Sequence, residues 1–287
     1  MLRADVVDLI VKLALREDVG RKDITTTALF GEKLHIRAEI EAKEAGILCG
    51  AEVAERVFRH VDENLRFLPV AKDGEVLEPQ REVAYIDGSA RSILIAERTA
   101  LNFIGHLSGI ATMTGRFVEK VKGTKARIMD TRKTAPNLRV LEKYAVATGG
   151  GVNHRSGLYD QVLIKDNHLR VLKDRSIPDI VLAVKESVLK NTVVGIEVKN
   201  LKELAEALKT KVNYVLLDNM TPEVVRDAVK MRNAFVGARR AVPELEVSGG
   251  ITLDNVRVYA ETGVERISIG ALTHSSPWLD VSLNIVG

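Results

Sequence analysis

The chain has 287 residues, 46% of them hydrophobic, and its 42 Lys and Arg against 39 Asp and Glu give a formal net charge of +3. This composition supports a buried core and excludes disordered and collagen-like chains, while the length predicts two domains or one large domain with an appendage. A single cysteine, Cys49, excludes an internal disulfide framework and is typical of a reducing compartment, here the cytoplasm. No apolar run approaches the roughly 20 residues of a membrane helix.

The first hundred residues predict a mixture of helices and strands. Residues 1–18 carry acidic side chains inside an apolar stretch, which favours an amphipathic helix over a signal peptide. Strict alternation over 33–43 predicts a half-buried strand of an antiparallel sheet. Apolar residues recur at helical spacing over 51–61, and Lys-Asp-Gly-Glu at 72–75 indicates a turn.

Residues 91–122 form a long helical pattern that three glycines interrupt. Because Gly105, Gly109 and Gly115 weaken a helix interior, we expect two helices here rather than one.

After Gly123, short apolar runs alternate with helical patterns. Asn200 with Glu203, and Thr221 followed by Pro222, are helix start signals between the runs. Such alternation predicts parallel βα units in a barrel or an open doubly wound sheet, and the barrel is favoured because no G-x-G-x-x-G follows a run. The runs are 127–130, 162–165, 193–198, 214–218, 245–248 and 266–270.

Each run ends in a polar residue or glycine, or carries one near its end. In a parallel barrel the C-terminal strand ends share one rim, where active sites lie, so six such residues together predict a site. Taken singly, they have structural alternatives: a salt bridge for Glu197, turn chemistry for Asp218, a connector for the glycines at 149–151, and structural roles for His154 and His168. The rim residues are Asp130, Lys165, Glu197, Asp218, Ser248 and Gly270.

The positive charge is concentrated between Lys125 and Arg175, where 11 Lys and Arg face 5 Asp and Glu, a local charge of +6. Only two aromatic residues lie in this segment, which disfavours a nucleic-acid surface and favours a small polyanion. Guanidinium groups bind carboxylates bidentately, so we expect a polycarboxylate here. The candidate cationic residues are Arg132, Lys133, His154, Arg155 and Lys165.

A phosphate site and a metal site are also predicted. Ser248, Gly249 and Gly250, followed by a predicted helix, resemble with Gly270 the phosphate cradle of barrels. Glu197 and Asp218 are oxygen ligands suited to Mg²⁺, held directly or through water and substrate. No Ser-His-Asp, Cys-His or zinc-spaced arrangement is found.

Long motifs resemble the quinolinate phosphoribosyltransferase family over almost the whole chain. The motifs DTRKT and LIKDNH are specific, and they lie in or beside the segment of concentrated charge. The matching blocks are 14–20, 23–25, 96–102, 107–112, 130–139, 141–145, 149–155, 163–168, 217–219, 248–251 and 269–272.

The resemblance implies a fold and a reaction. The expected fold is an N-terminal α/β sandwich with an antiparallel sheet, residues 1–115, and a C-terminal incomplete parallel α/β barrel, residues 116–287, whose extreme C-terminus can return to the first domain. The implied enzyme is a pentosyltransferase that joins quinolinate to phosphoribosyl pyrophosphate, giving nicotinate mononucleotide, pyrophosphate and CO₂ in NAD biosynthesis. Mg²⁺ is expected and an organic cofactor is not.

The resemblance also implies residue roles and a homodimer. Arg132, His154, Arg155 and Lys165 are expected to hold quinolinate, and Arg98 to reach the same pocket from the partner subunit. The phosphoribosyl pyrophosphate and its Mg²⁺ are assigned to Lys133, Glu197, Asp218, Ser248, Gly249, Gly250 and Gly270. Lys133, Lys165, Glu197 and Asp218 are the expected catalytic residues.

Four residues depart from the family pattern without removing a charged site residue: Lys22, His106, Ala135 and Asn137. Two alternatives remain: a paralogous phosphoribosyltransferase of the same fold acting on another aromatic acid, and a basic nucleic-acid-binding module.

Overall fold

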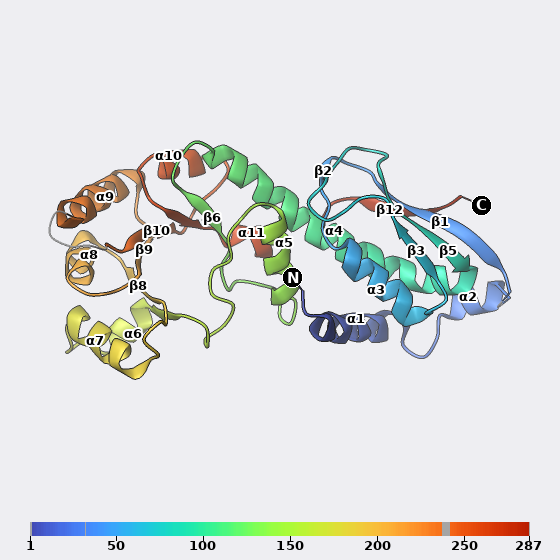
Figure 1. Ribbon diagram of the computed structural model, residues 1–287, viewed down its shortest axis with the longest axis horizontal. Coiled ribbons are helices and arrows are strands. Elements are labelled where there is room, and N and C mark those ends of the chain that lie inside the picture. The colour runs from blue at the N-terminus through green and yellow to red at the C-terminus, as the bar shows by residue number, and fades with distance from the viewer. Residues whose placement is uncertain (1, 32, 237–241, 287) are drawn as a thin grey trace. The chain divides into compact units, whose positions relative to one another are not determined.

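The computed structural model describes residues 2–31, 33–236 and 242–286 (Figure 1). Contacts group these residues into two compact units. The first contains the residues up to Gly115, Thr134–Gly150 and the residues from Ala271 onward; the second contains Arg116–Lys133 and Gly151–Gly270. Thr134–Gly150 therefore groups with the N-terminal part of the chain, although it lies in the stretch that the sequence assigned to the barrel.

A four-stranded antiparallel sheet in the order β12-β1-β5-β3 organises the first unit, beside a two-stranded sheet of β2 and β4. The C-terminal strand β12 pairs with β1, so the end of the described chain belongs to this sheet. The elements are α1 (Ala4–Val19), α2 (Ile24–Leu29), β1 (His35–Ala42), β2 (Gly46–Ile47), α3 (Ala51–Val61), β3 (Arg66–Pro69), β4 (Val76–Leu77), β5 (Glu82–Ser89), α4 (Ala90–Val121), α5 (Arg139–Thr148), α11 (Ala271–His274) and β12 (Val281–Ile285).

Three predictions for this unit are confirmed. The alternating pattern forms β1, and its Ala38, Ile40 and Ala42 are fully buried. Helix α3 spans the predicted residues and buries Val57 and Phe58. The amphipathic N-terminal stretch forms α1, which packs against α3.

The prediction of two helices over residues 91–122 is wrong, because α4 is one helix of 32 residues. Its glycines serve close packing. A Cβ on Gly109 would lie 2.1 Å from the carbonyl oxygen of Pro277, and one on Gly105 would lie 2.9 Å from that of Leu279. The Leu279 amide also donates to the Gly105 carbonyl at 2.9 Å. Glycine here lets the C-terminal segment lie directly on the helix.

All six predicted apolar runs form strands of one parallel sheet in the second unit, in the order β6-β11-β10-β9-β8-β7. Within the described residues β6 and β7 do not pair, although Val152 forms a single bridge with Met129 of β6. The barrel is therefore incomplete, as expected. Its elements are β6 (Arg127–Met129), β7 (Val162–Ile164), α6 (Asp166–Val171), α7 (Ile177–Ser187), β8 (Val194–Val198), α8 (Leu201–Leu208), β9 (Tyr214–Asp218), α9 (Pro222–Val236), β10 (Glu244–Ser248), α10 (Val256–Ala260) and β11 (Arg266–Ser268).

The predicted helix starts are confirmed. Asn200 caps α8 by accepting the Glu203 amide at 2.9 Å, and α9 begins at Pro222. Among the helices of the described residues, none combines the length and the apolar character needed to cross a lipid bilayer.

Candidate active site

The C-terminal ends of the parallel strands bring the predicted site residues of the second unit to one edge of its sheet. In the strand register, Ser248 of β10 is level with Ser268 of β11 and with Asp218 of β9. Ile164, the last residue of β7, is level with Ile196, one residue before Glu197. Active sites of parallel α/β barrels lie at this edge, because the loops that follow the strands converge there.

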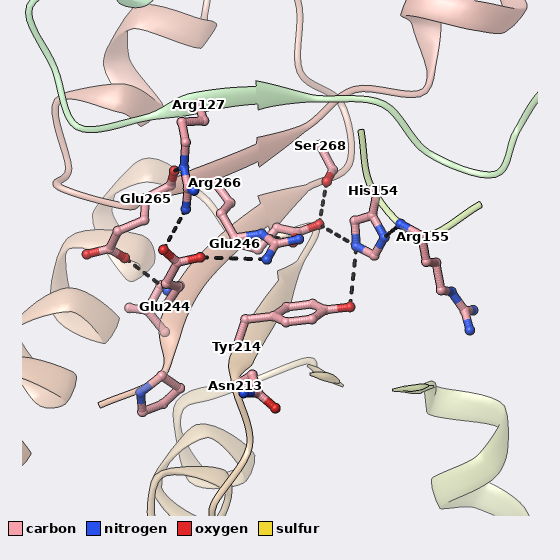
Figure 2. Close-up of polar contacts among 12 residues, drawn as sticks. Arg127, His154, Arg155, Asn213, Tyr214, Glu244, Glu246, Glu265, Arg266 and Ser268 are labelled. Carbon is pink, nitrogen blue, oxygen red and sulfur yellow. Dashed lines mark hydrogen bonds and ion pairs between the residues drawn. The ribbon is translucent and has the colours of Figure 1, made fainter. Parts of the chain in front are cut away.

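Asp130 and His154 organise the polypeptide on the β6 side of this edge. Asp130 directly follows β6, is fully buried, and accepts the His154 amide at 2.8 Å. The His154 side chain is 6% exposed, and its Nδ1 accepts the Arg155 amide at 2.7 Å. His154 Nε2 lies 3.3 Å from Glu246 Oε1 and 3.4 Å from the Tyr214 hydroxyl (Figure 2). Both nitrogens of the ring are therefore engaged within the protein.

The guanidinium groups of Arg155 and Arg132 lie within electrostatic range of each other here. Arg155 is 6% exposed, and its Nη1 donates to the Gln161 carbonyl at 3.3 Å. Burial, followed by the positive charge of Arg132, lowers the pKa of Arg155. A lowered arginine pKa means that the site raises the free energy of the charged form, and a bound anion would reverse this effect. The pair is consequently suited to a carboxylate ligand.

Lys165 lies between β7 and α6, and its backbone is fixed by a histidine. The Lys165 amide donates to His168 Nδ1 at 2.9 Å, and the His168 amide donates to the Lys165 carbonyl at 2.9 Å. The side chain of Lys165 remains exposed. The histidine of the LIKDNH motif thus orients the residue that the motif contributes to the candidate site.

Glu197 and Asp218 form the acidic part of the site. Burial, followed by the negative charge of Asp218, raises the pKa of Glu197, while the charge of Lys165 and the Asp166 amide lower it in part. The two carboxylates therefore repel each other across neighbouring strands. A cation bound between them would relieve that repulsion.

The Ser248-Gly249-Gly250 segment has a backbone that only glycine adopts easily. Gly249 and Gly250 have φ of +100° and +63°, and a Cβ on Gly249 would lie 2.1 Å from Asn219 Oδ1. The predicted helix follows as α10, which starts at Val256. Backbone amides of such a glycine loop can bind a phosphate.

Three predicted residues remain, two in the second unit and one in the first. Lys133 is exposed, and its amide donates to Thr131 Oγ1 at 3.1 Å. Gly270 follows β11 and is partly exposed. Arg98 is exposed on α4 in the first unit.

Sequence reasoning missed the buried polar side chains inside the barrel. Figure 2 shows Glu246, Tyr214 and Ser268 pointing toward His154 from strands β10, β9 and β11. A charged residue in the middle of the apolar run at 245–248 was the available signal, because a carboxylate is rarely buried without a partner.

The residues present fit Mg²⁺ better than a metal held by protein ligands alone. Across residues 2–31, 33–236 and 242–286, no group of three or more His, Cys, Asp or Glu is placed to hold a metal ion. Mg²⁺ is usually bound by one or two carboxylates together with substrate phosphates and water, which suits the pair Glu197 and Asp218.

Fold and site together place basic side chains, two carboxylates and a glycine loop at the strand ends of an incomplete parallel barrel. Family models described as the N-terminal and C-terminal domains of quinolinate phosphoribosyl transferase match residues 23–108 and 110–284. The chain belongs to the quinolinate phosphoribosyltransferase family.

Individual relatives agree with this assignment. The chain is 43% identical over 279 residues to the probable nicotinate-nucleotide pyrophosphorylase [carboxylating] of Methanocaldococcus jannaschii, covering 96% of each chain. It is 40% identical over 278 residues to the nicotinate-nucleotide pyrophosphorylase [carboxylating] of Mycobacterium leprae, covering 96% of this chain and 95% of the relative. The solved nicotinate-nucleotide pyrophosphorylase from Francisella tularensis superposes with a TM-score of 0.92 at 37% identity, covering 100% and 98%.

Proposed function

We propose that this chain transfers the phosphoribosyl group of phosphoribosyl pyrophosphate to quinolinate, with loss of CO₂, to give nicotinate mononucleotide and pyrophosphate. One observation carries the proposal within the family: the second unit holds two positive charges that act on each other, Arg132 and Arg155, and two negative charges that do the same, Glu197 and Asp218. A carboxylate ligand would stabilise the two charged arginines, and a bound cation would stabilise the two charged carboxylates.

Quinolinate is a dicarboxylate, so its transfer from water needs several cations. Arg132 and Arg155 offer planar donor groups, and Lys165 adds a positive charge that already acts on Glu197. Lys165 has an electrostatic role here, because quinolinate carries no ketone or aldehyde for a Schiff base. His154 stays assigned to the quinolinate site, where its Nδ1 accepts the Arg155 amide and fixes that backbone.

Phosphoribosyl pyrophosphate is assigned to the other strand ends. The amides around Ser248, Gly249 and Gly250, with Gly270 and the ammonium of Lys133, are suited to phosphate oxygens. Glu197 and Asp218 would hold Mg²⁺ through water and substrate, and that ion would neutralise the charge of the departing pyrophosphate.

The reaction needs positioning and electrostatic stabilisation more than covalent chemistry. As the bond from ribose C1 to pyrophosphate breaks, positive charge develops on the ribose, and Glu197 and Asp218 can stabilise it. The quinolinate nitrogen then bonds to C1 and becomes quaternary. The adjacent carboxylate leaves as CO₂, its bonding electrons stay on the ring carbon beside the cationic nitrogen, and that carbon takes a proton. No organic cofactor is required.

We also propose that the active form is a homodimer in which Arg98 of one subunit completes the site of its partner. The exposed position of Arg98 on α4 leaves it available to another chain. In subunit exchange between Arg98→Ala and Lys133→Ala variants, activity should return, because one hybrid site has both residues. No recovery in exchanged dimers would contradict a shared site.

The function is tested by measuring CO₂ and pyrophosphate release from quinolinate and phosphoribosyl pyrophosphate with Mg²⁺. Nicotinate, which has one carboxylate fewer, is the control substrate. Equal release of both products from quinolinate, and little or none from nicotinate, is expected. Turnover of nicotinate at a comparable rate would favour a phosphoribosyltransferase for another aromatic acid.

The family match disfavours the remaining alternative, a nucleic-acid-binding module. Such a module would bind many sequences with an affinity that falls steeply with salt; we expect no binding at physiological salt. A cytoplasmic location stays a prediction, and one plant relative, 37% identical, is named as chloroplastic.

A further inference from the structure

A fully buried carboxylate lies inside the barrel, away from the proposed ligand groups. Glu246 occupies the middle of β10, and its exposure is 0%. Arg266 Nε lies 2.7 Å from its Oε2, and the Ser268 hydroxyl donates to its Oε1. A buried ion pair seldom improves stability over apolar packing, so its presence calls for a role in the function of the protein.

The contacts of His154 define which of its nitrogens carries the proton. Its Nδ1 faces the Arg155 amide at 2.7 Å, and because that amide can only donate, Nδ1 must accept. The proton of the neutral ring is then on Nε2, which faces Glu246 Oε1 at 3.3 Å and the Tyr214 hydroxyl at 3.4 Å. Both oxygens can accept that hydrogen.

The surroundings keep Glu246 ionised and the network rigid. Burial raises the pKa of Glu246, but the hydrogen bond of His154, the charge of Arg266 and the hydrogen bond of Ser268 lower it overall. The Arg266 guanidinium stacks over the Tyr214 ring, 4.2 Å from its centroid. A Cβ on Gly195 would lie 2.1 Å from that ring, so glycine on β8 makes room for it.

We propose that Glu246 is a positioning residue for quinolinate binding: it holds His154 in the Nε2–H tautomer, and His154 Nδ1 in turn fixes the backbone of Arg155 (Figure 2). The inference rests on the proposed function, because it concerns the residue assigned to the quinolinate carboxylates. It differs from a role in stability alone in predicting an effect on one substrate and not on the other.

Glutamine cannot replace Glu246 in this network. A carboxylate presents an acceptor oxygen on each side: Oε1 accepts from Ser268 and faces His154, and the charge of Oε2 faces Arg266 Nε at 2.7 Å. An amide has one acceptor, so its NH₂ group must face either the Arg266 donors or His154 Nε2. If the NH₂ group faces Arg266, two donor groups oppose each other. If it faces His154 Nε2, the His154 proton must move to Nδ1, where it opposes the Arg155 amide.

Steady-state kinetics of Glu246→Gln test the proposal. The KM for quinolinate should rise about tenfold, equivalent to about 1.4 kcal/mol, while kcat and the KM for phosphoribosyl pyrophosphate stay within about twofold. The matched control is Glu244→Gln on the same strand. Glu244 pairs with Arg127 and Arg266 but not with His154, and this variant should keep the wild-type KM for quinolinate.

A second substitution supplies a rescue that a general structural defect would not show. In Glu246→Gln combined with Arg266→Met, the glutamine oxygen can face His154 with no donor opposing its NH₂ group, so most of the lost quinolinate affinity should return. If Glu246→Gln does not fold, Ser268→Ala removes one donor to Glu246 and should raise the KM for quinolinate about threefold.

The outcomes separate this inference from the proposed function. Absence of quinolinate turnover in the wild-type protein would contradict the proposed function. A wild-type enzyme that is active, with an unchanged quinolinate KM in Glu246→Gln or equal changes for both substrates, would overturn the role of Glu246 alone. For an unfolded Glu246→Gln, an unchanged quinolinate KM in Ser268→Ala would do the same.

Discussion

The second unit contains a cationic region, with Arg132 and Arg155, and an acidic region, with Glu197 and Asp218. In both regions burial and a like charge make the ionised side chain less favourable. Near the end of β6, burial and then the charge of Arg132 lower the pKa of Arg155. At the ends of β8 and β9, burial and the charge of Asp218 raise the pKa of Glu197. In each region the fold holds like charges close together, which costs stability until a ligand of opposite sign binds.

The two regions differ in how deeply their side chains are buried and in how their backbones are held. Arg155 is buried and its backbone is fixed by His154, whereas Lys165 and Lys133 are exposed. The carboxylates are only partly buried. A rigid, dehydrated pocket suits an organic acid of fixed shape, and a more hydrated acidic pair suits Mg²⁺, which keeps several of its waters.

The largest expected effect is in the cationic region. Arg155→Ala removes charge-assisted hydrogen bonds to a carboxylate, about 3 kcal/mol, so the KM for quinolinate should rise about 100-fold. Steady-state kinetics with each substrate varied in turn measure this effect. Arg226→Ala, on the exposed face of α9, is the control and should behave as wild type. An unaltered quinolinate KM in Arg155→Ala would place the pocket elsewhere.

In the acidic region, Glu197→Gln should lower kcat about 30-fold and raise the Mg²⁺ concentration needed for half-maximal rate. The reason is the loss of one of two anionic groups that stabilise the cation and the ribose charge, about 2 kcal/mol. Its KM for quinolinate should change less than threefold. Magnesium titrations at saturating substrates provide the measurement, and a wild-type Mg²⁺ dependence in the variant would argue against the assignment.

A smaller effect is expected from His168, which holds the backbone of Lys165 at the C-terminal end of β7. His168→Ala removes the acceptor of the Lys165 amide and should raise the KM for quinolinate about fivefold, equivalent to about 1 kcal/mol. In His168→Asn the side-chain oxygen takes the place of Nδ1, so the KM should stay within about twofold of wild type. Equal losses in both variants would show that the hydrogen bond is not what matters.

The smallest effect is on stability. Because the pKa of Glu197 is raised in the folded state, the folded protein binds a proton that the unfolded chain has released, and stability falls as pH rises through that window. Glu197→Gln should therefore raise the Tm of the metal-free protein by about 1–3 °C at neutral pH. The gain should vanish in acid, below the ordinary carboxylate pKa. A lower Tm at neutral pH would mean that Glu197 is not repelled by Asp218.

The sequence predicted the second unit well because local patterns determine it. Six apolar runs became six strands, and polar residues at their ends met at one edge because parallel strands are in register. The single helix α4 was missed because the backbone atoms that need Gly105 and Gly109 lie near residue 278, far along the chain. Glu246 was missed because a strand pattern does not reveal which side chains meet inside a barrel.

The central claim is that the two regions bind different ligands, and kinetics of Arg155→Ala and Glu197→Gln side by side test it most directly. The account predicts that Arg155→Ala changes the quinolinate KM and leaves the Mg²⁺ requirement unchanged, whereas Glu197→Gln does the reverse. If both variants change both quantities in the same proportion, the regions do not have separate ligands and the account is contradicted.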